Sequence, residues 1–343
     1  MPGINHSRVT ARLALALAAG FAAAAAADDA RGLLERMERA LATRNYQGTF
    51  VHEHDGQSET LRIVHRVEGE GFAERLVSLD GSGREVIRRD GELRAYFPDQ
   101  RVALVESDRK SGLLFSGLQG LDGSAGQMYR LSEEAPTRIS GREARVLLVE
   151  PLDDLRYGYR VWVDEASAMP LKTQLHTAGG RLLEELVFTD LSLPAQVADA
   201  ALQPARSASR CRLLRHAAAA ASEPPQAADT TWDAADLPPG FRLVANSTRL
   251  MGNEQRAVTH LVFSDGLASV SVFVEPQSRQ PVNNAQEPVP QTVTRLGSSS
   301  AVSTEVDGHR VTAIGEVPPA TVRAIAGSLR PGFAPGARPG GHR

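Results

Sequence analysis

The chain of 343 residues carries 38 Lys and Arg against 41 Asp and Glu, a formal net charge of −3. This balance lacks the basic excess with which nucleic-acid-binding proteins attract phosphate, so we expect no nucleic-acid partner. The length favours two domains over one. Cys211 is the single cysteine, so an internal disulfide is excluded and the fold must rest on buried apolar surface. We interpret Cys211 as a tolerated free thiol with no assigned role.

Residues 1–27 are typical of a cleaved export signal. Arg8 and Arg12 precede an alanine-rich apolar run that stops at Asp28, and the small residues before it predict cleavage after Ala27. The run, about fifteen residues long, is too short and too weakly apolar to anchor the chain in a membrane. Removing its two arginines leaves 36 basic and 41 acidic residues, a net charge of −5. We therefore expect an exported protein and exclude this segment from the fold.

The hydrophobic pattern predicts one helix followed by a long run of strands. Residues 29–44 place Leu33, Leu34, Met37 and Leu41 on one stripe of an amphipathic helix. From Tyr46 onward apolar residues alternate with polar ones, and short turns such as Asp90-Gly91 separate the runs. Consecutive hairpins of this kind predict one large antiparallel sheet with one apolar face.

Residues 107–127 interrupt the strands with a stretch that is both glycine-rich and apolar. Its large apolar side chains are Leu113, Leu114, Phe115 and Leu118. Burying each is worth about 1.5–3 kcal/mol, so we expect the segment to plug the open mouth of the curved sheet. An acyl chain entering that mouth would compete for the same surface. Phe50 and Trp162 are further candidates for lining such a lipid pocket, although the strand that carries Trp162 favours a core or rim position for its aromatic side chains.

The strands resume and lead to a second domain. Residues 28–200 form the first predicted domain, and residues 201–230, with an alanine run and almost no large apolar residues, are typical of a linker. Residues 231–331 predict a small α+β domain with two hairpins and a helix that begins at Pro318-Pro319. Residues 332–343 predict a flexible tail. The predicted fold class is therefore α+β, with a large curved antiparallel sheet and a smaller second domain.

No catalytic or metal-binding motif supports an enzyme. His52 and His54 alternate on one strand, but no neighbouring cluster supplies further metal ligands. Adjacent carboxylates such as Glu184 and Glu185 point to opposite faces of a strand, which is poor geometry for acid and base catalysis. We expect no cofactor, no metal and no catalytic activity.

Arginines crowd the first strands, and guanidinium groups bind phosphate and carboxylate in a bidentate manner. Arg62 and Arg66 are the candidates for holding an anionic lipid group at the rim of the pocket. The alternative is a solvated sheet face on which the arginines pair with glutamates, which contributes little to stability.

Several segments in both halves of the chain resemble the MucB/RseB family. The N-terminal resemblance lies in Asn45-Tyr-Gln-Gly-Thr-Phe-Val, Leu61-Arg-Ile-Val-His-Arg-Val, Glu74-Arg-Leu-Val-Ser-Leu-Asp-Gly, Arg84-Glu-Val-Ile-Arg and Pro98-Asp-Gln. The C-terminal resemblance lies in Leu237-Pro-Pro-Gly-Phe, in His260-Leu-Val-Phe-Ser-Asp-Gly-Leu-Ala-Ser-Val-Ser-Val-Phe-Val-Glu and in Gly308-His-Arg-Val-Thr-Ala-Ile-Gly-Glu-Val-Pro. Both blocks occur in order and span nearly all of residues 31–330.

The resemblance implies a periplasmic negative regulator of the sigma-E envelope-stress response. Such a protein binds the periplasmic segment of a membrane-spanning anti-sigma factor and shields it from regulated proteolysis. The family's N-terminal domain resembles the half-open barrel of lipoprotein carriers, and lipopolysaccharide or another acyl lipid is the implied release signal. A homo-oligomer is left open. The alternative function is a periplasmic lipid or lipoprotein carrier, although a carrier needs only the first domain.

Overall fold

A computed structural model describes residues 29–69, 71–81, 83–107, 127–205, 211–215, 231–251, 256–276 and 292–332. The predicted cleavage site after Ala27 and the predicted plug residues Leu113, Leu114, Phe115 and Leu118 lie outside these ranges. No helix in the described ranges is long and apolar enough to cross a membrane.

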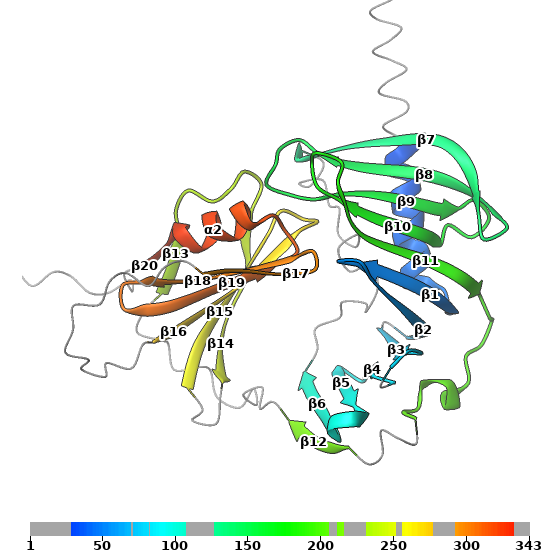
Figure 1. The fold of residues 1–343 in the computed structure, drawn as a ribbon, viewed down its shortest axis with the longest axis horizontal. Helices are drawn as coiled ribbons and strands as arrows, with labels where there is room; N and C mark the ends of the chain where they lie inside the picture. The colour runs from blue at the N-terminus through cyan, green and yellow to red at the C-terminus, as the bar shows by residue number, and fades with distance from the viewer. Residues whose placement is uncertain are drawn as a thin grey trace, which may run out of the picture.

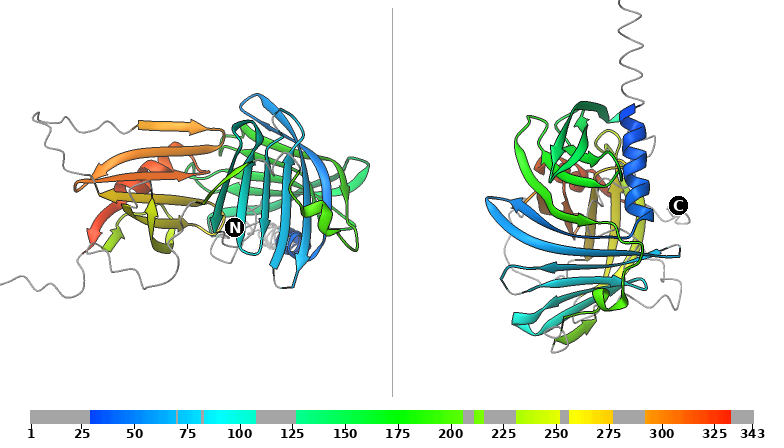
Figure 2. Two further views of the ribbon diagram at one scale, coloured as in Figure 1. Left: turned by 90° about the horizontal axis from the view of Figure 1, so that it is seen from below. Right: turned by 90° about the vertical axis from the view of Figure 1, so that its right-hand side faces the viewer.

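The N-terminal domain is one large, strongly curved sheet with a helix on one face (Figures 1 and 2). The helix covers residues 29–43, which confirms the predicted helix within one residue. The strands are β1 (Tyr46–His54), β2 (Gln57–Glu68), β3 (Gly71–Ser78), β4 (Glu85–Arg89), β5 (Glu92–Phe97), β6 (Val102–Ser107), β7 (Tyr129–Ile139), β8 (Arg142–Pro151), β9 (Gly158–Asp164), β10 (Pro170–His176), β11 (Leu182–Ser192) and β12 (Arg212–Arg215). Two short 3-10 helices, η1 (Pro98–Gln100) and η4 (Asp199–Leu202), interrupt the connections.

The twelve strands lie in the order β12-β6-β5-β4-β3-β2-β1-β11-β10-β9-β8-β7, so β12 and β7 are the two edges of an open sheet. This confirms the predicted half-open architecture. All pairings are antiparallel except that of β12 with β6. Strand β12 comes from residues 201–230, whose composition is typical of a linker.

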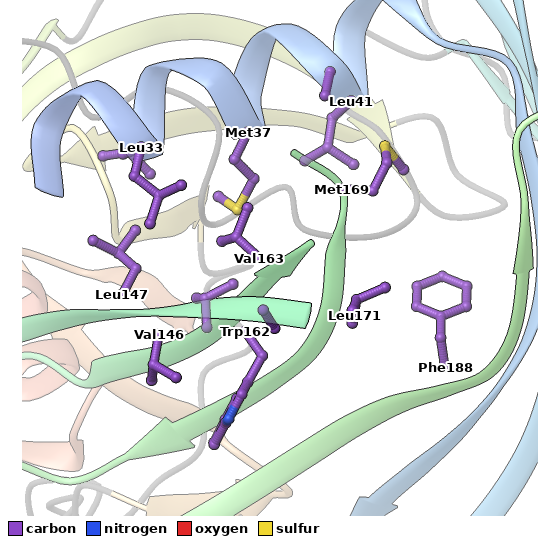
Figure 3. Close-up of a cluster of buried hydrophobic side chains, with 14 of the residues drawn as sticks. Leu33, Met37, Leu41, Val146, Leu147, Trp162, Val163, Met169, Leu171 and Phe188 are labelled. Carbon is purple, nitrogen blue, oxygen red and sulfur yellow. The ribbon is translucent and has the colours of Figure 1, made fainter. Parts of the chain in front are cut away.

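The N-terminal helix covers the half of the sheet formed by β7 to β11 and β1. Leu33 and Met37 of the helix point toward Leu147 and Val163, and Leu41 lies near Met169, as Figure 3 shows. The predicted apolar stripe is confirmed, because each of its four side chains is at most 3% exposed. We call the face of the sheet that contacts this helix the helix-side face and the opposite one the outer face.

The C-terminal domain is a six-stranded antiparallel sheet with a helix on one face (Figure 1). Its elements are β13 (Thr231–Ala234), β14 (Arg242–Met251), β15 (Arg256–Ser264), β16 (Ser269–Pro276), β17 (Thr292–Leu296), β18 (Ser299–Val306), β19 (His309–Gly315), α2 (Pro319–Ser328) and β20 (Leu329–Gly332). The sheet order is β14-β15-β16-β19-β18-β17, and β13 pairs with β20 separately. Val322, Ile325 and Ala326 of α2 are fully buried in the core of this domain. The two predicted hairpins and the helix after Pro318 are thereby confirmed.

Candidate functional site

An apolar row crosses the helix-side face beyond the N-terminal helix. Cross-strand pairing aligns one residue of each strand from β2 to β12, namely Ile63, Leu76, Val86, Ala95, Leu104 and Leu214. Directly paired residues share a face, so these side chains form one continuous apolar surface. The row is fully buried at Ile63 but reaches 39% exposure at Leu104. An acyl chain or an apolar plug can pack against a surface of this kind.

Phe50 and Trp162, the two predicted pocket residues within the described ranges, lie on opposite faces. Phe50 pairs with Phe188 and belongs to the core beneath the helix, where it is 1% exposed. Trp162 pairs with Val146 and Lys172 and points away from the helix in Figure 3. Arg160 and Lys172 cover its ring at 4.8 and 4.9 Å. Phe50 therefore lines the helix-side face and Trp162 does not.

Arg62 and Arg66 both lie on the outer face, because they alternate with Leu61 and Ile63 along β2. Arg66 pairs with Glu68 and, at 2.6 Å, with Asp199, and it also donates a hydrogen bond to the carbonyl of Val197. It thus fastens the segment after β11 to the sheet. Arg62 is exposed. This placement favours the alternative, in which the arginines belong to a solvated, ion-paired face. It does not favour a rim of arginines that binds an anionic lipid group beside the apolar row.

The side chains of Tyr46, His65 and Glu74 form a buried polar cluster on the helix-side face. The Nδ1 atom of His65 lies 2.8 Å from Oε1 of Glu74, and the hydroxyl of Tyr46 donates to the same oxygen at 3.3 Å. The His65 ring stacks between Tyr46 and Phe72. Burial, together with the Glu74 carboxylate, raises the pKa of Tyr46 well above its ordinary value. The phenol therefore stays neutral and serves as a hydrogen-bond donor in this part of the sheet.

The two domains meet in a buried seam at the ends of β7, β8 and β9. Arg156, in the turn between β8 and β9, pairs with Asp265 of the C-terminal domain at 3.2 Å, and both side chains are fully buried. The hydroxyl of Tyr129 donates to the same Asp265 oxygen at 3.1 Å. Leu267, two residues further on, packs into the hydrophobic core of the N-terminal domain. The seam is therefore built like a protein interior.

A second part of the seam lies near the end of β1. The backbone amides of Gly297 and Ser298, in the turn between β17 and β18, donate to Asp55 at 2.9 Å and to Glu184 at 3.1 Å. His52 contacts the other Glu184 oxygen at 3.3 Å. Partial burial acts to raise the pKa of Glu184, but hydrogen bonds from His52 and Ser298 outweigh it and lower the pKa to about 2. Glu184 therefore stays ionised as an acceptor for the docked turn.

His52 and His54 were considered as a metal site, and one of them, His52, has a structural role. His52 and His54 lie with ring centroids 5.0 Å apart, and His52 contacts Glu184. Across the described part of the chain, no three His, Cys, Asp or Glu side chains are grouped so as to hold a metal ion.

Sequence reasoning missed the seam and most of the apolar row. Arg156 follows Asp153-Asp154 in a turn, where arginine is normally exposed, and nothing local marks it as buried. The turn at Asp265-Gly266 belongs to one of the two predicted hairpins, but no local pattern indicates that this turn inserts into another domain. The alternation along β2 to β6 did carry the signal for the row, since each contributing residue lies at an apolar position of its strand.

Taken together, the open sheet, its partly exposed apolar row and the docked second domain define a two-domain binding protein. Two family models match the chain in order, the MucB/RseB N-terminal domain over residues 29–206 and the MucB/RseB C-terminal domain over residues 226–330. The chain therefore belongs to the MucB/RseB family of periplasmic sigma-factor regulators.

Curated relatives and solved structures agree with this assignment. The chain is 34% identical over 306 residues to the sigma factor AlgU regulatory protein MucB of Pseudomonas aeruginosa, covering 89% of this chain and 92% of the relative. It is 28% identical to the sigma-E factor regulatory protein RseB of Escherichia coli K12, covering 92% and 95%. A solved complex of Pseudomonas aeruginosa MucA and MucB superposes with a TM-score of 0.68 at 32% identity, covering 89% of this chain and all of that one. A further crystal structure, of MucB, gives a TM-score of 0.59 at the same identity, covering 89% of this chain and 98% of that one.

Proposed function

We propose that this chain is a non-enzymatic periplasmic regulator that binds the periplasmic segment of a membrane-spanning anti-sigma factor and shields it from regulated proteolysis. The observation that carries the proposal is the similarity to MucB in two structures solved with MucA, at TM-scores of 0.68 and 0.66. Each match covers 89% of this chain, which is too large a share for either domain alone. A partner surface that uses both domains is therefore consistent with what the chain shares with these complexes.

The apolar row supports lipid binding as the signal that releases the anti-sigma segment. Lipopolysaccharide and other acyl lipids bring long apolar chains, and the row offers a surface that grades from buried Ile63 to exposed Leu104. A contiguous exposed apolar patch on a folded protein often marks a binding site, whereas single apolar residues scattered over the surface do not. A lipid that binds one arrangement of the protein better than another shifts the population toward it, and thereby changes partner affinity.

A lipid or lipoprotein carrier is the second candidate, and the same apolar row favours it. A carrier acts by accepting and delivering acyl chains, for which the N-terminal domain suffices. The separate match of residues 226–330 to the MucB/RseB C-terminal domain supports the regulator instead. The two candidates differ in vesicle assays, because only a carrier speeds the transfer of acyl lipid between donor and acceptor vesicles.

The proposed function is tested with the purified chain and the periplasmic segment of its host's anti-sigma factor. Calorimetry should show saturable binding, and a protease that cleaves the free segment should cleave the bound segment much more slowly. Titrating lipopolysaccharide into the complex should release the segment. Absence of binding contradicts the regulator, and binding without protection contradicts the shielding role.

A further inference from the structure

Arg156 is a fully buried charged side chain at the seam, and its contacts come from both domains. Its Nε atom lies 3.2 Å from Asp265 and 3.5 Å from Asp153 of its own turn. One terminal nitrogen donates to the carbonyl oxygen of Pro239 at 2.6 Å. Its guanidinium carbon lies 5.3 Å from the ring centre of Phe241, also in the C-terminal domain. The arginine thus projects from the first domain into a socket made largely by the second.

Asp265 is held equally firmly. One carboxylate oxygen accepts the backbone amides of Leu267 and Ala268 at 3.0 and 2.7 Å, which fixes the β15–β16 turn. The other oxygen accepts the hydroxyl of Tyr129 at 3.1 Å and faces Arg156. Burial, together with the Asp265 charge, raises the pKa of Tyr129, so the hydroxyl remains a donor. Both oxygens of the Asp265 carboxylate are therefore engaged in this relative orientation of the two domains.

We propose that Arg156 is a positioning residue whose buried pairing with Asp265 fixes the orientation of the two domains that the anti-sigma segment recognises. The inference rests on the proposed function for the identity of the partner. The domain orientation itself is a separate property of the chain and can be measured without any partner.

The physics of buried ion pairs explains why such a pair can act as an orientation device. Compared with apolar residues of the same shape it adds little stability, because removing two charges from water costs almost what their attraction returns. Losing one partner is a different matter, since it leaves the other charge buried and uncompensated. Any misaligned docking of the domains would do the same to both Arg156 and Asp265. The pair thus selects one arrangement against its neighbours.

A double-mutant cycle between Arg156 and Asp265 tests the proposal in the full chain. Arg156→Met removes one charge at similar length, whereas Asp265→Asn keeps the oxygen that the turn requires. The domain distance is read from spin labels at Glu165→Cys and Glu305→Cys, both exposed positions, in a Cys211→Ser background. Affinity for the anti-sigma segment is measured in the same preparations.

Arg145→Met is the matched control, because Arg145 pairs with Glu133 and Asp29 within the first domain.

Each single variant should broaden the distance distribution and shift the docking equilibrium about a hundredfold or more toward separated domains. Segment affinity should fall in proportion to the docked fraction. The double variant, which buries no charge from this pair, should regain most of the docking and of the affinity. Arg145→Met should leave the distances and the affinity near those of the unmodified chain.

Three results overturn the proposal: distances that do not change in the single variants, affinity that does not change while the distances broaden, and a double variant that recovers neither. If Arg156→Met fails to fold, Asp265→Asn decides by the same two measurements. If the unmodified chain does not bind the segment at all, the proposed function fails, whereas the distances still decide whether this pair orients the domains.

Discussion

The backbone amide of Ser298 donates a hydrogen bond to Oε1 of Glu184, 3.1 Å away, and so joins a turn of the C-terminal domain to a strand of the N-terminal sheet. Gly297 makes this approach feasible. Its φ of +62° suits glycine, and a β-carbon at that position would lie 3.2 Å from the same glutamate oxygen. The seam therefore depends on a charged acceptor and on a backbone free of side chain.

Replacing Glu184 should change how stability depends on pH. The pKa of Glu184 is lowered in the folded chain to about 2, below its ordinary value of 4.5, so its contribution is present above pH 4.5 and is lost as pH falls toward 2. Glu184→Gln should therefore lower the free energy of unfolding near pH 7 by up to about 3 kcal/mol, and the difference should shrink steadily below pH 5. Urea unfolding at several pH values measures it. Glu165→Gln, at an exposed turn, serves as the control, and a difference that grows on acidification would contradict the prediction.

Leu267→Ala should destabilise the chain although Leu267 lies in a loop. The side chain is 6% exposed and packs into the core of the other domain, so its truncation leaves a cavity that costs about 2–5 kcal/mol. Leu243→Ala, at a position 43% exposed in the same domain, should cost at most about 0.5 kcal/mol. Thermal unfolding followed by circular dichroism compares the two variants. Equal effects would show that Leu267 does not act as a core residue.

Gly240→Ala should weaken the seam through a steric clash. Gly240 has φ of +82°, and a β-carbon there would lie 2.6 Å from Cγ of Met128, the residue before β7. Gly91→Ala provides the matched control, since Gly91 has φ of +74° and open space around the added carbon. The control should lose about 1–2 kcal/mol from backbone strain alone, and Gly240→Ala clearly more. Both losses are measured by urea unfolding, and similar losses would mean that Met128 yields without cost.

The parts of the fold that local pattern specifies were predictable from the sequence. The helix over residues 29–43 and the β15–β16 hairpin follow from periodicity and turn residues, because both depend on neighbours along the chain. The faces of individual strands did not follow in the same way. A register shift between Pro170 and Lys172 changes which residues oppose each other, so Trp162 could not be assigned to a face from alternation alone.

Long-range pairings were beyond the reach of sequence patterns. Strand β12 forms by parallel pairing with β6, more than a hundred residues earlier, from a segment whose composition is typical of a linker. Arg156 is buried only because Asp265 and Pro239 of the second domain meet it. The sequence around Arg156 and around Asp265 does not indicate that the two side chains are in contact. The contact becomes visible once both domains are placed together.

The apolar row makes a prediction for lipid binding with a control built into the same edge of the sheet. Leu104 lies on the helix-side face at 39% exposure, whereas Leu213, on the neighbouring strand β12, lies on the outer face at 52% exposure. Leu104→Asp should reduce binding of lipopolysaccharide about tenfold or more, because a carboxylate would have to be desolvated where an acyl chain packs. Leu213→Asp adds the same charge one position away and should leave binding unchanged. Fluorescent lipid displacement measures both, and circular dichroism confirms that both variants are folded.

The predicted plug can be placed in the same test. Leu114→Asp combined with Phe115→Asp should impair both lipid binding and lipid-driven release of the anti-sigma segment, if that segment of the chain competes with lipid for the apolar row. Release is measured as loss of segment fluorescence anisotropy during a lipopolysaccharide titration. A folded double variant with normal lipid binding and normal release would show that residues 107–127 are only structural. If Leu104→Asp were then also without effect, the row would have no part in lipid recognition, and the release signal would have to be sought elsewhere on the molecule.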